Sequence, residues 1–301
     1  MAQGFIRQGL LGLFQSEFHG EEEIVLGKIF CSPGVSALIA MLGLVIGWGQ
    51  VGGGLSWGQE VDLAEVAQKT EKKVFRRANG FELPYRLLIP EKYDPARKYP
   101  LIVFLHGAGE RGTDNEAQLR HPQVLRLALD EKDPCFLVAP QCPRNSSWTD
   151  LLATFRQGLK ELPPITEPML ATIELLEALS REYSLDRDRW YVTGLSMGGF
   201  GTFDLLIRKP DWFAAGVPLC GGMPEAEAPK IAHIPMWIFH GAADRVVPPE
   251  LSRRAVRALQ AAGATNVRYT EYEGVGHDVW RKAYLEPELR TWLLAQKRTP
   301  K

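Results

Sequence analysis

The chain has no marked excess of charge of either sign. It carries 35 Lys and Arg residues against 36 Asp and Glu residues, which gives a formal net charge of -1. Neither a basic stripe nor an acidic tail occurs, and their absence argues against a nucleic-acid partner and against a surface that collects cations. Internal repeats and low-complexity linkers are also missing, so the 301 residues suit one large domain preceded by the N-terminal segment described below.

Cysteine is scarce, with four residues in the chain: Cys31, Cys135, Cys142 and Cys220. Cys135 and Cys142 fall on or near one expected strand, too far apart along an extended backbone to form a bridge. Cys142 and Cys220 both fall at the ends of expected strands, so the sequence leaves a disulfide between them open. None of the four has the spacing of metal ligands, and we expect neither a metal site nor a cofactor.

Charged residues are absent from residues 29–59. The apolar centre of this run spans residues 37–46, and Ser56-Trp57-Gly58 places small residues where a signal peptidase reads. We therefore expect residues 1–58 to be a secretory leader and residues 59–301 to form a catalytic domain that is exported to the periplasm or beyond the cell. An uncleaved membrane anchor is the alternative, since the run is about long enough to span a bilayer. The short apolar centre and the Gly-rich flanks favour the cleaved signal.

Beyond that segment, continuous apolar runs alternate with segments of helical periodicity. Asn79-Gly80 predicts the turn of a β-hairpin, and the short apolar runs predict strands that are buried on both faces. Strands that alternate with helices predict an α/β domain, with a mostly parallel sheet covered by helices on both faces. The expected strands are residues 74–77, 81–88, 101–105, 136–139, 190–193, 214–219, 235–239 and 267–272, and the expected helices are residues 169–183, 197–208, 250–262 and 283–296.

A serine between two glycines marks the most informative turn, Gly194-Leu195-Ser196-Met197-Gly198, directly after the apolar run 190–193. This pattern between a strand and a helix is typical of a nucleophile elbow, which lifts the serine hydroxyl out of the sheet. Glycine is needed at positions 194 and 198 because a side chain at either position would collide with the neighbouring strand or helix. Ser196 is therefore the candidate nucleophile, and its neutral hydroxyl requires a base that accepts its proton during attack.

Two later turns supply an acid and a base in the order that such an elbow requires. Asp244 follows the expected strand 235–239, and His277 follows the expected strand 267–272. As general base, His277 would accept the proton of Ser196, while Asp244 would hold the imidazole in one tautomer. Asp278 is a rival for the acid, but adjacent side chains rarely orient each other in this way.

A glycine-rich turn, His106-Gly107-Ala108-Gly109, follows the expected strand 101–105. Such a turn exposes backbone N–H groups, and we expect those of Ala108 and Met197 to form the oxyanion hole. We interpret His106 as a residue that braces the turn rather than as a base.

Two tryptophans, Trp148 and Trp280, are candidates for substrate contact because they fall on expected loops near the cleft. Each either belongs to the core or stacks on an aromatic or sugar ring, since aromatic side chains are enriched in ligand pockets. We keep both as candidate substrate-binding residues.

Residues 105–112, 191–202, 274–280 and 292–298 resemble the α/β-hydrolase esterases often labelled predicted peptidase. These are similar to the phospholipase/carboxylesterase, feruloyl esterase and polyhydroxybutyrate depolymerase groups. The resemblance runs from about Phe75 to Arg298, and it implies the α/β-hydrolase fold and a secreted or periplasmic serine esterase. No insertion is long enough for a large lid, although residues 145–168 have the length to cap the cleft.

The leading interpretation is a carboxylic ester hydrolase that acts through an acyl-serine, with Ser196, Asp244 and His277 as its triad. Its substrate would be a small-molecule or polymer-attached ester, because an open cleft suits such esters better than a lipid droplet. A serine peptidase of the prolyl-oligopeptidase type is the first alternative, which the lack of a propeller domain argues against. A non-catalytic surface binding protein on a hydrolase scaffold is the second, which the complete triad argues against. Only an uncleaved anchor would bring the protein to a membrane.

Overall fold

The computed structural model describes residues 62–130, 132–158 and 160–298. The expected leader over residues 1–58 lies outside this part of the chain, so the choice between a cleaved signal and an anchor stays a prediction. Among the helices that are described, none combines the length and the hydropathy that a membrane span needs.

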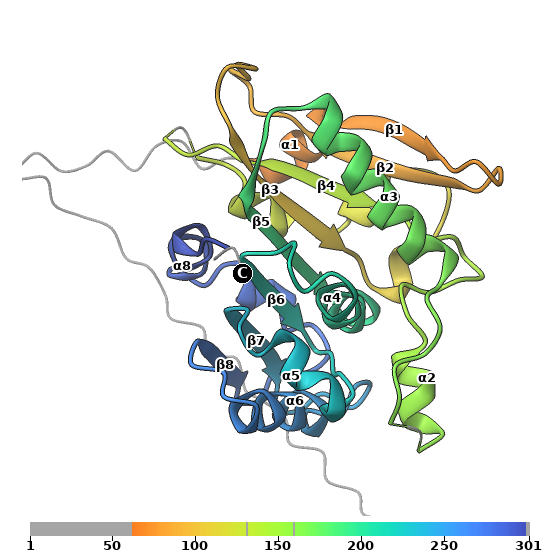
Figure 1. Ribbon diagram of the computed structural model, residues 1–301, viewed down its shortest axis with the longest axis vertical. Helices are drawn as coiled ribbons and strands as arrows, with labels where there is room; N and C mark the ends of the chain where they lie inside the picture. The colour runs from red at the N-terminus through yellow and green to blue at the C-terminus, as the bar shows by residue number, and fades with distance from the viewer. Residues whose placement is uncertain (1–61, 131, 159, 299–301) are drawn as a thin grey trace, which may run out of the picture. The chain divides into compact units, whose positions relative to one another are not determined.

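An eight-stranded sheet forms the centre of the domain, in the order β1-β2-β4-β3-β5-β6-β7-β8 (Figure 1). The hairpin of β1 and β2 is antiparallel, β2 pairs antiparallel with β4, and all other neighbours are parallel. This confirms the predicted α/β class and the mostly parallel sheet. The strands are β1 (Glu71–Arg76), β2 (Glu82–Leu88), β3 (Tyr99–Leu105), β4 (Phe136–Pro140), β5 (Leu185–Leu195), β6 (Ala215–Leu219), β7 (Met236–Gly241) and β8 (Val267–Tyr272).

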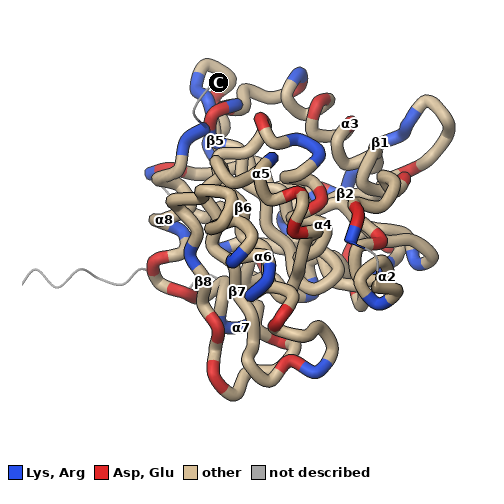
Figure 2. Tube along the Cα trace, turned by 60° about the horizontal axis from the view of Figure 1, so that its bottom comes forward, with Lys and Arg blue, Asp and Glu red and all other residues tan. Residues whose placement is uncertain are grey.

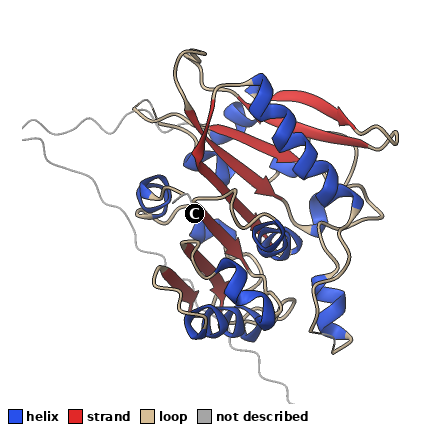
Figure 3. Ribbon diagram, viewed as in Figure 1, coloured by secondary structure: helices blue, strands red, loops and turns tan. Residues whose placement is uncertain are grey.

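Helices cover both faces of the sheet (Figure 3), because successive strand residues point to opposite sides. On β3, Leu101, Val103 and Leu105 enter one apolar cluster, whereas Ile102 and Phe104 enter the other. The first cluster receives α3 (Glu167–Glu182), α4 (Met197–Arg208), α5 (Ala228–Ile231) and α6 (Glu250–Ala261), and the second receives the 3-10 helix η3 (Pro122–Leu127), α7 (Trp280–Ala283) and α8 (Leu289–Ala295). Short elements complete the domain: α1 (Leu63–Lys69), η1 (Ala108–Glu110), η2 (Ala117–Leu119), α2 (Leu151–Arg156) and η4 (Glu225–Glu227).

The predicted C-terminal helix over residues 283–296 is wrong, because the structure divides this stretch into α7 and α8. Pro287 lies between the two helices. A proline has no backbone N–H, and its ring disfavours helical backbone in the residue before it, so one continuous helix cannot run through Pro287.

The segment 145–168, which the sequence left as a cap for the cleft, contains one short helix, α2. The ring of Phe155 on α2 lies 6.2 Å from the ring of Phe200, in the first turn of α4. The segment therefore lies beside the helix that follows Ser196.

Cys142 and Cys220 form no disulfide, since both are buried free thiols. Cys142 follows β4 and Cys220 follows β6, and β3 and β5 lie between these strands in the sheet. Three inter-strand spacings amount to roughly 14 Å, which is well beyond the separation that a disulfide can bridge.

Acidic and basic residues are interspersed along the chain trace rather than gathered on one element (Figure 2). Several form local pairs: Arg77, in the turn of the hairpin, contacts Glu167 and Glu174 on α3. Half-exposed pairs of this kind contribute about 1 kcal/mol or less to stability, so burial of the two apolar clusters supplies most of the stabilisation.

Candidate active site

Ser196 lies on the turn between β5 and α4, in a strained backbone conformation. Its φ of 55° falls in a region that residues other than glycine rarely adopt. The turn is held on both sides, because the Ser196 N–H donates to the Leu219 carbonyl (3.0 Å) and the Phe200 N–H donates to the Ser196 carbonyl (3.1 Å). This sharp turn carries the Ser196 hydroxyl at the N-terminus of α4, as in a nucleophile elbow.

Two glycines of the turn allow α4 to begin in contact with the sheet. A Cβ on Gly194 would overlap the carbonyl of Gly198, and a Cβ on Gly198 would overlap the carbonyl of Leu105 on β3. The turn therefore has no room for side chains at either position.

The structure brings Ser196, His277 and Asp244 together at the carboxyl ends of β5, β8 and β7. The Nε2 atom of His277 lies 2.9 Å from Ser196 Oγ, and its Nδ1 atom lies 2.7 Å from Asp244 Oδ2. An imidazole between a hydroxyl and a carboxylate is placed to accept the hydroxyl proton while the carboxylate orients the ring. Asp278, the rival acid, is exposed and lies 3.8 Å from Arg281.

Asp244 is buried and is bound by four donors. The Val246 and Val247 N–H groups donate to Oδ1 at 2.8 and 2.9 Å, while His277 Nδ1 and His240 Nε2 lie 2.7 and 3.3 Å from Oδ2. Burial raises the pKa of Asp244, but the hydrogen bonds from the two histidines and the two amides outweigh it and hold the pKa well below its ordinary value. The carboxylate therefore stays ionised throughout the neutral range.

His106 braces the turn after β3, as expected from the sequence. Its Nε2 accepts the Cys142 N–H at 2.9 Å, and its Nδ1 donates to the Gly107 carbonyl at 2.6 Å. The Trp148 indole donates to the His106 carbonyl at 3.0 Å. Burial lowers the pKa of His106 to about 4, so the ring is neutral at pH 7.

The same turn leaves backbone donors open near Ser196. Leu105 pairs with Gly194 across β3 and β5, which places the turn at Ala108 beside the serine turn. Within residues 62–130, 132–158 and 160–298, the N–H groups of Ala108 and Met197 have no hydrogen-bond acceptor. Unpaired donors at the start of a helix favour a negative charge.

We expect His106 to make the stability of the protein depend on pH between about 6.5 and 4. The folded-state pKa lies below the unfolded value, so the unfolded chain binds more protons in this window. The contribution is complete above about pH 6.5 and is lost as the pH falls through about 4, and it amounts to on the order of 3 kcal/mol. Urea unfolding of the protein and of His106→Gln at several pH values checks this, because glutamine retains an acceptor without a titration. Equal pH slopes for the two proteins would contradict the expectation.

Trp148 belongs to the core. Its side chain has 0% exposure, and its ring lies 5.2 Å from that of His106 in an edge-on arrangement. An indole without exposed surface cannot stack on a substrate ring, so the substrate-binding prediction for Trp148 is wrong. Nothing in the sequence indicated that the Trp148 indole N–H donates to the His106 carbonyl.

Trp280 lies directly beside the candidate base. Its half-buried ring lies 5.6 Å from the ring of His277, perpendicular to it, and 5.3 Å from the ring of His121. Nε2 of His121 in turn lies 3.6 Å from a carboxylate oxygen of buried Glu110, on η1. Contact between Trp280 and substrate stays a prediction, and the structure adds His121 and Glu110 to the surroundings of His277.

One group of side chains in the described part of the chain has the composition of a metal site. Ligand atoms of Cys220, Asp244 and His277 all lie within 4.8 Å of one another. Two of these residues are already bound to each other, and burial raises the pKa of the Cys220 thiol, which disfavours the thiolate that a metal requires. The arrangement is thus suited to hydrogen bonding rather than to holding a cation.

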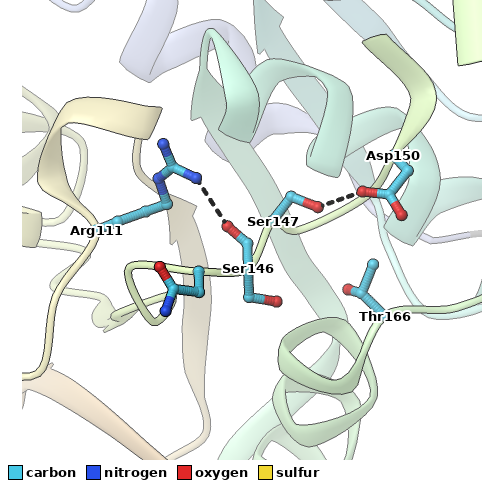
Figure 4. A pocket seen from close by; sticks show the side chains of 6 residues that line it. Arg111, Ser146, Ser147, Asp150 and Thr166 are labelled. Atoms are coloured by element: carbon cyan, nitrogen blue, oxygen red, sulfur yellow. Dashed lines mark hydrogen bonds between the residues drawn. The ribbon is translucent and has the colours of Figure 1, made fainter. Parts of the chain in front are cut away.

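A polar cavity of about 330 Å³ lies beside the turn His106-Gly107-Ala108-Gly109 (Figure 4). Arg111 joins the two, since its Nε donates to the Ala108 carbonyl (3.0 Å) and its Nη1 to the Ser146 carbonyl (3.2 Å). On the other side, Ser147 donates to Asp150 at 2.7 Å. The lining residues are Arg111, Asn145, Ser146, Ser147, Asp150 and Thr166, none of which has an apolar side chain. The charges of Arg111 and Asp150 cancel, so the lining has no formal net charge.

His240 is a further residue of this region for which the sequence predicts no role. It ends β7 in a His-Gly pair, as His106 does after β3. That repeated pair at the carboxyl ends of two parallel strands is the sequence signal that points to it.

The fold and the site together define an α/β-hydrolase. A family model for phospholipases and carboxylesterases matches residues 88–284, and the chain belongs to this phospholipase/carboxylesterase family.

A solved thermostable esterase is 40% identical, with a TM-score of 0.72 over 78% of this chain and 64% of that one. An endo-1,4-beta-xylanase/feruloyl esterase from Xylanibacter ruminicola is 28% identical over 190 residues, which are 62% of this chain and 25% of that protein. Poly(3-hydroxyalkanoate) depolymerase C from Paucimonas lemoignei is 28% identical over 123 residues, which are 41% of this chain and 28% of that protein. The chain therefore spans about a quarter of the length of both relatives.

Proposed function

We propose that the protein is a carboxylic ester hydrolase that acts through an acyl-serine intermediate. The observation that carries the proposal is the pair of hydrogen bonds that joins Ser196 to His277 and His277 to Asp244. Membership of the phospholipase/carboxylesterase family and the similarity to a solved esterase support the same reaction.

In the first half of the reaction, Ser196 Oγ attacks the ester carbonyl carbon while His277 Nε2 takes the hydroxyl proton. Asp244 stabilises the imidazolium that results, and the N–H groups of Ala108 and Met197 bind the oxyanion. The intermediate then expels the alcohol, which receives the proton from His277. Ser196 is left acylated.

In the second half, water replaces the alcohol. His277 removes a proton from the water as it attacks the acyl-serine, the same two N–H groups hold the second oxyanion, and His277 returns the proton to Ser196 as the acid leaves. The free enzyme is regenerated without a cofactor.

The peptidase alternative finds less support. The solved esterase and the two curated relatives described above carry the names of esterases or of a depolymerase, and none of the three is named as a peptidase. The binding-protein alternative leaves unexplained why a strained serine should be bonded to a histidine and a buried carboxylate.

The polar cavity supports a substrate class. Its neutral, hydrogen-bonding lining suits a hydroxylated and uncharged group, such as a sugar to which the ester is attached, better than a long alkyl chain. We place this group of a small-molecule or polymer-attached ester in the cavity, between Arg111 and Asp150.

A substrate panel tests both statements. We expect 4-nitrophenyl acetate and an acetylated pentoside to be hydrolysed, and the matching 4-nitroanilide and the 4-nitrophenyl ester of a long fatty acid to be poor substrates. Asp150→Ala should raise KM for the acetylated pentoside about tenfold, because a hydrogen bond to a charged group is lost, and should leave KM for 4-nitrophenyl acetate unchanged. Glu161→Ala, at an exposed acid of the same segment, is the matched control. Faster turnover of the anilide than of the ester would favour the peptidase.

Export is the second part of the proposal, and the uncharged run over residues 29–59 supports it. Cleavage of the leader would leave Gln59 as the new N-terminus. N-terminal sequencing of the exported protein decides between this terminus and an uncleaved anchor.

A further inference from the structure

A second histidine, His240, contacts the same carboxylate oxygen of Asp244 as His277 does. His240 has 0% exposure at the end of β7, and its Nε2 lies 3.0 Å from the Val247 carbonyl and 3.3 Å from Asp244 Oδ2. Both partners are acceptors, so Nε2 must carry a hydrogen. This N–H donates to the Val247 carbonyl and also lies against Oδ2 of Asp244, so two imidazoles, those of His240 and His277, contact Oδ2.

The other nitrogen of the His240 ring, Nδ1, is also held by a hydrogen bond. Nδ1 of His240 lies 2.7 Å from Ser252 Oγ on α6, and Ser252 Oγ lies 2.8 Å from the Gly221 carbonyl. Ser252 has one hydroxyl hydrogen, and this hydrogen has two possible acceptors. If the hydroxyl donates to the Gly221 carbonyl, Nδ1 of His240 must donate to Ser252 and the ring is an imidazolium. If the hydroxyl donates to Nδ1, the ring is neutral. In both arrangements Nε2 keeps its hydrogen, which is donated to the Val247 carbonyl while Nε2 stays in contact with Asp244 Oδ2.

This network ties the acid to the turn that supports the nucleophile. Gly221 follows Cys220 and leaves no room for a side chain, because a Cβ on it would lie 2.6 Å from the Gly199 backbone in α4. His240 and Ser252 thus connect Asp244 to the start of α4, directly after Ser196.

We propose that His240 is a positioning residue that holds the Asp244 carboxylate in the orientation His277 needs. Amides of its own turn hold Oδ1 of Asp244, whereas within the described part of the chain the contacts of Oδ2 are with the two histidines. Without the donor on His240, Oδ2 is free to follow His277 as that ring moves, and the imidazolium formed during attack loses a rigid partner. This inference rests on the acyl-serine mechanism proposed above.

A matched pair of variants tests the role. His240→Gln and His240→Met have side chains of nearly equal length, but only glutamine carries an N–H near the place of Nε2. We expect His240→Met to lower kcat roughly tenfold to a hundredfold, the value of a hydrogen bond to a charged group, with KM almost unchanged. His240→Gln should restore most of that loss.

Equal kcat values for the two variants, at matched thermal stability, would overturn the inference, as would a loss that falls on KM alone. Should His240→Met fail to fold, a comparison of Ser252→Ala with Ser252→Thr tests the same role through Nδ1 of the ring. We expect the larger kcat loss for alanine. Equal kcat values for the two variants would contradict the role. Ser196→Ala separates the two claims. Full activity in that variant would refute the mechanism, whereas its inactivity together with equal Gln and Met variants would refute only the role of His240.

Discussion

Replacing Ser196 with alanine should lower kcat for ester hydrolysis by about 10^4-fold or more. The reason is that the variant keeps the cleft, the oxyanion donors and the His277–Asp244 pair but has no atom that can carry the acyl group. Removing one hydroxyl from a half-buried turn leaves the packing of α4 against β3 unchanged, so stability should be retained. The measurement is steady-state hydrolysis of 4-nitrophenyl acetate together with thermal unfolding.

Ser180→Ala is the control for this variant. The Ser180 hydroxyl donates to the Glu177 carbonyl within α3, away from the turn at Ser196. Its loss should leave kcat within about twofold, because a substitution away from the site changes free energies by only about 0.5 kcal/mol. If Ser196→Ala hydrolyses the ester as fast as Ser180→Ala does, Ser196 is not the nucleophile.

The second large effect is expected for Asp244→Asn, which should lower kcat by about 10^4-fold. An amide that keeps its oxygen toward the Val246 and Val247 N–H groups turns its NH₂ group toward His277 Nδ1. Nδ1 must then accept a hydrogen bond, the remaining hydrogen moves to Nε2, and Nε2 can no longer take the proton of Ser196.

Asp278→Asn is the matched control, since Asp278 is adjacent to His277 in the chain but exposed. We expect its kcat to stay within a few-fold of the unmodified protein. The opposite result, a large loss for Asp278→Asn and a small one for Asp244→Asn, would show that Asp278 is the acid of the triad and that Asp244 is not. Initial rates on one ester at one pH are sufficient to decide.

Much of the fold follows from local sequence, because a strand buried on both faces needs a continuous apolar run. Val267–Tyr272 and Met197–Arg208 have the predicted bounds, since a turn or a proline marks their ends. The helices α2 and α5 are too short to show periodicity. The apolar pattern of residues 283–296 continues on both sides of Pro287, so periodicity alone predicts one helix where the structure has two.

The arrangement at the site follows from topology more than from any one motif. Parallel strands end at the same edge of the sheet, so the turns after β3, β5, β7 and β8 meet although 81 positions separate Ser196 from His277. Burial of Trp148 and the contact of His240 with Ser252 depend on how helices pack over that edge. Such contacts between distant side chains have no signature in spacing. The sequence therefore suggested a substrate role for Trp148, and the His-Gly pair at the end of β7 did not reveal the partners of His240.

The central claim is that Ser196 is the nucleophile that carries the acyl group, and covalent labelling tests this claim most directly. A fluorophosphonate reacts with a serine only where a base activates it and an oxyanion site receives the phosphoryl oxygen. Mass spectrometry of the labelled protein should find one adduct, on the peptide that contains Ser196, and none in Ser196→Ala. An adduct on another serine, or no adduct on a folded protein that still hydrolyses esters, would contradict the account.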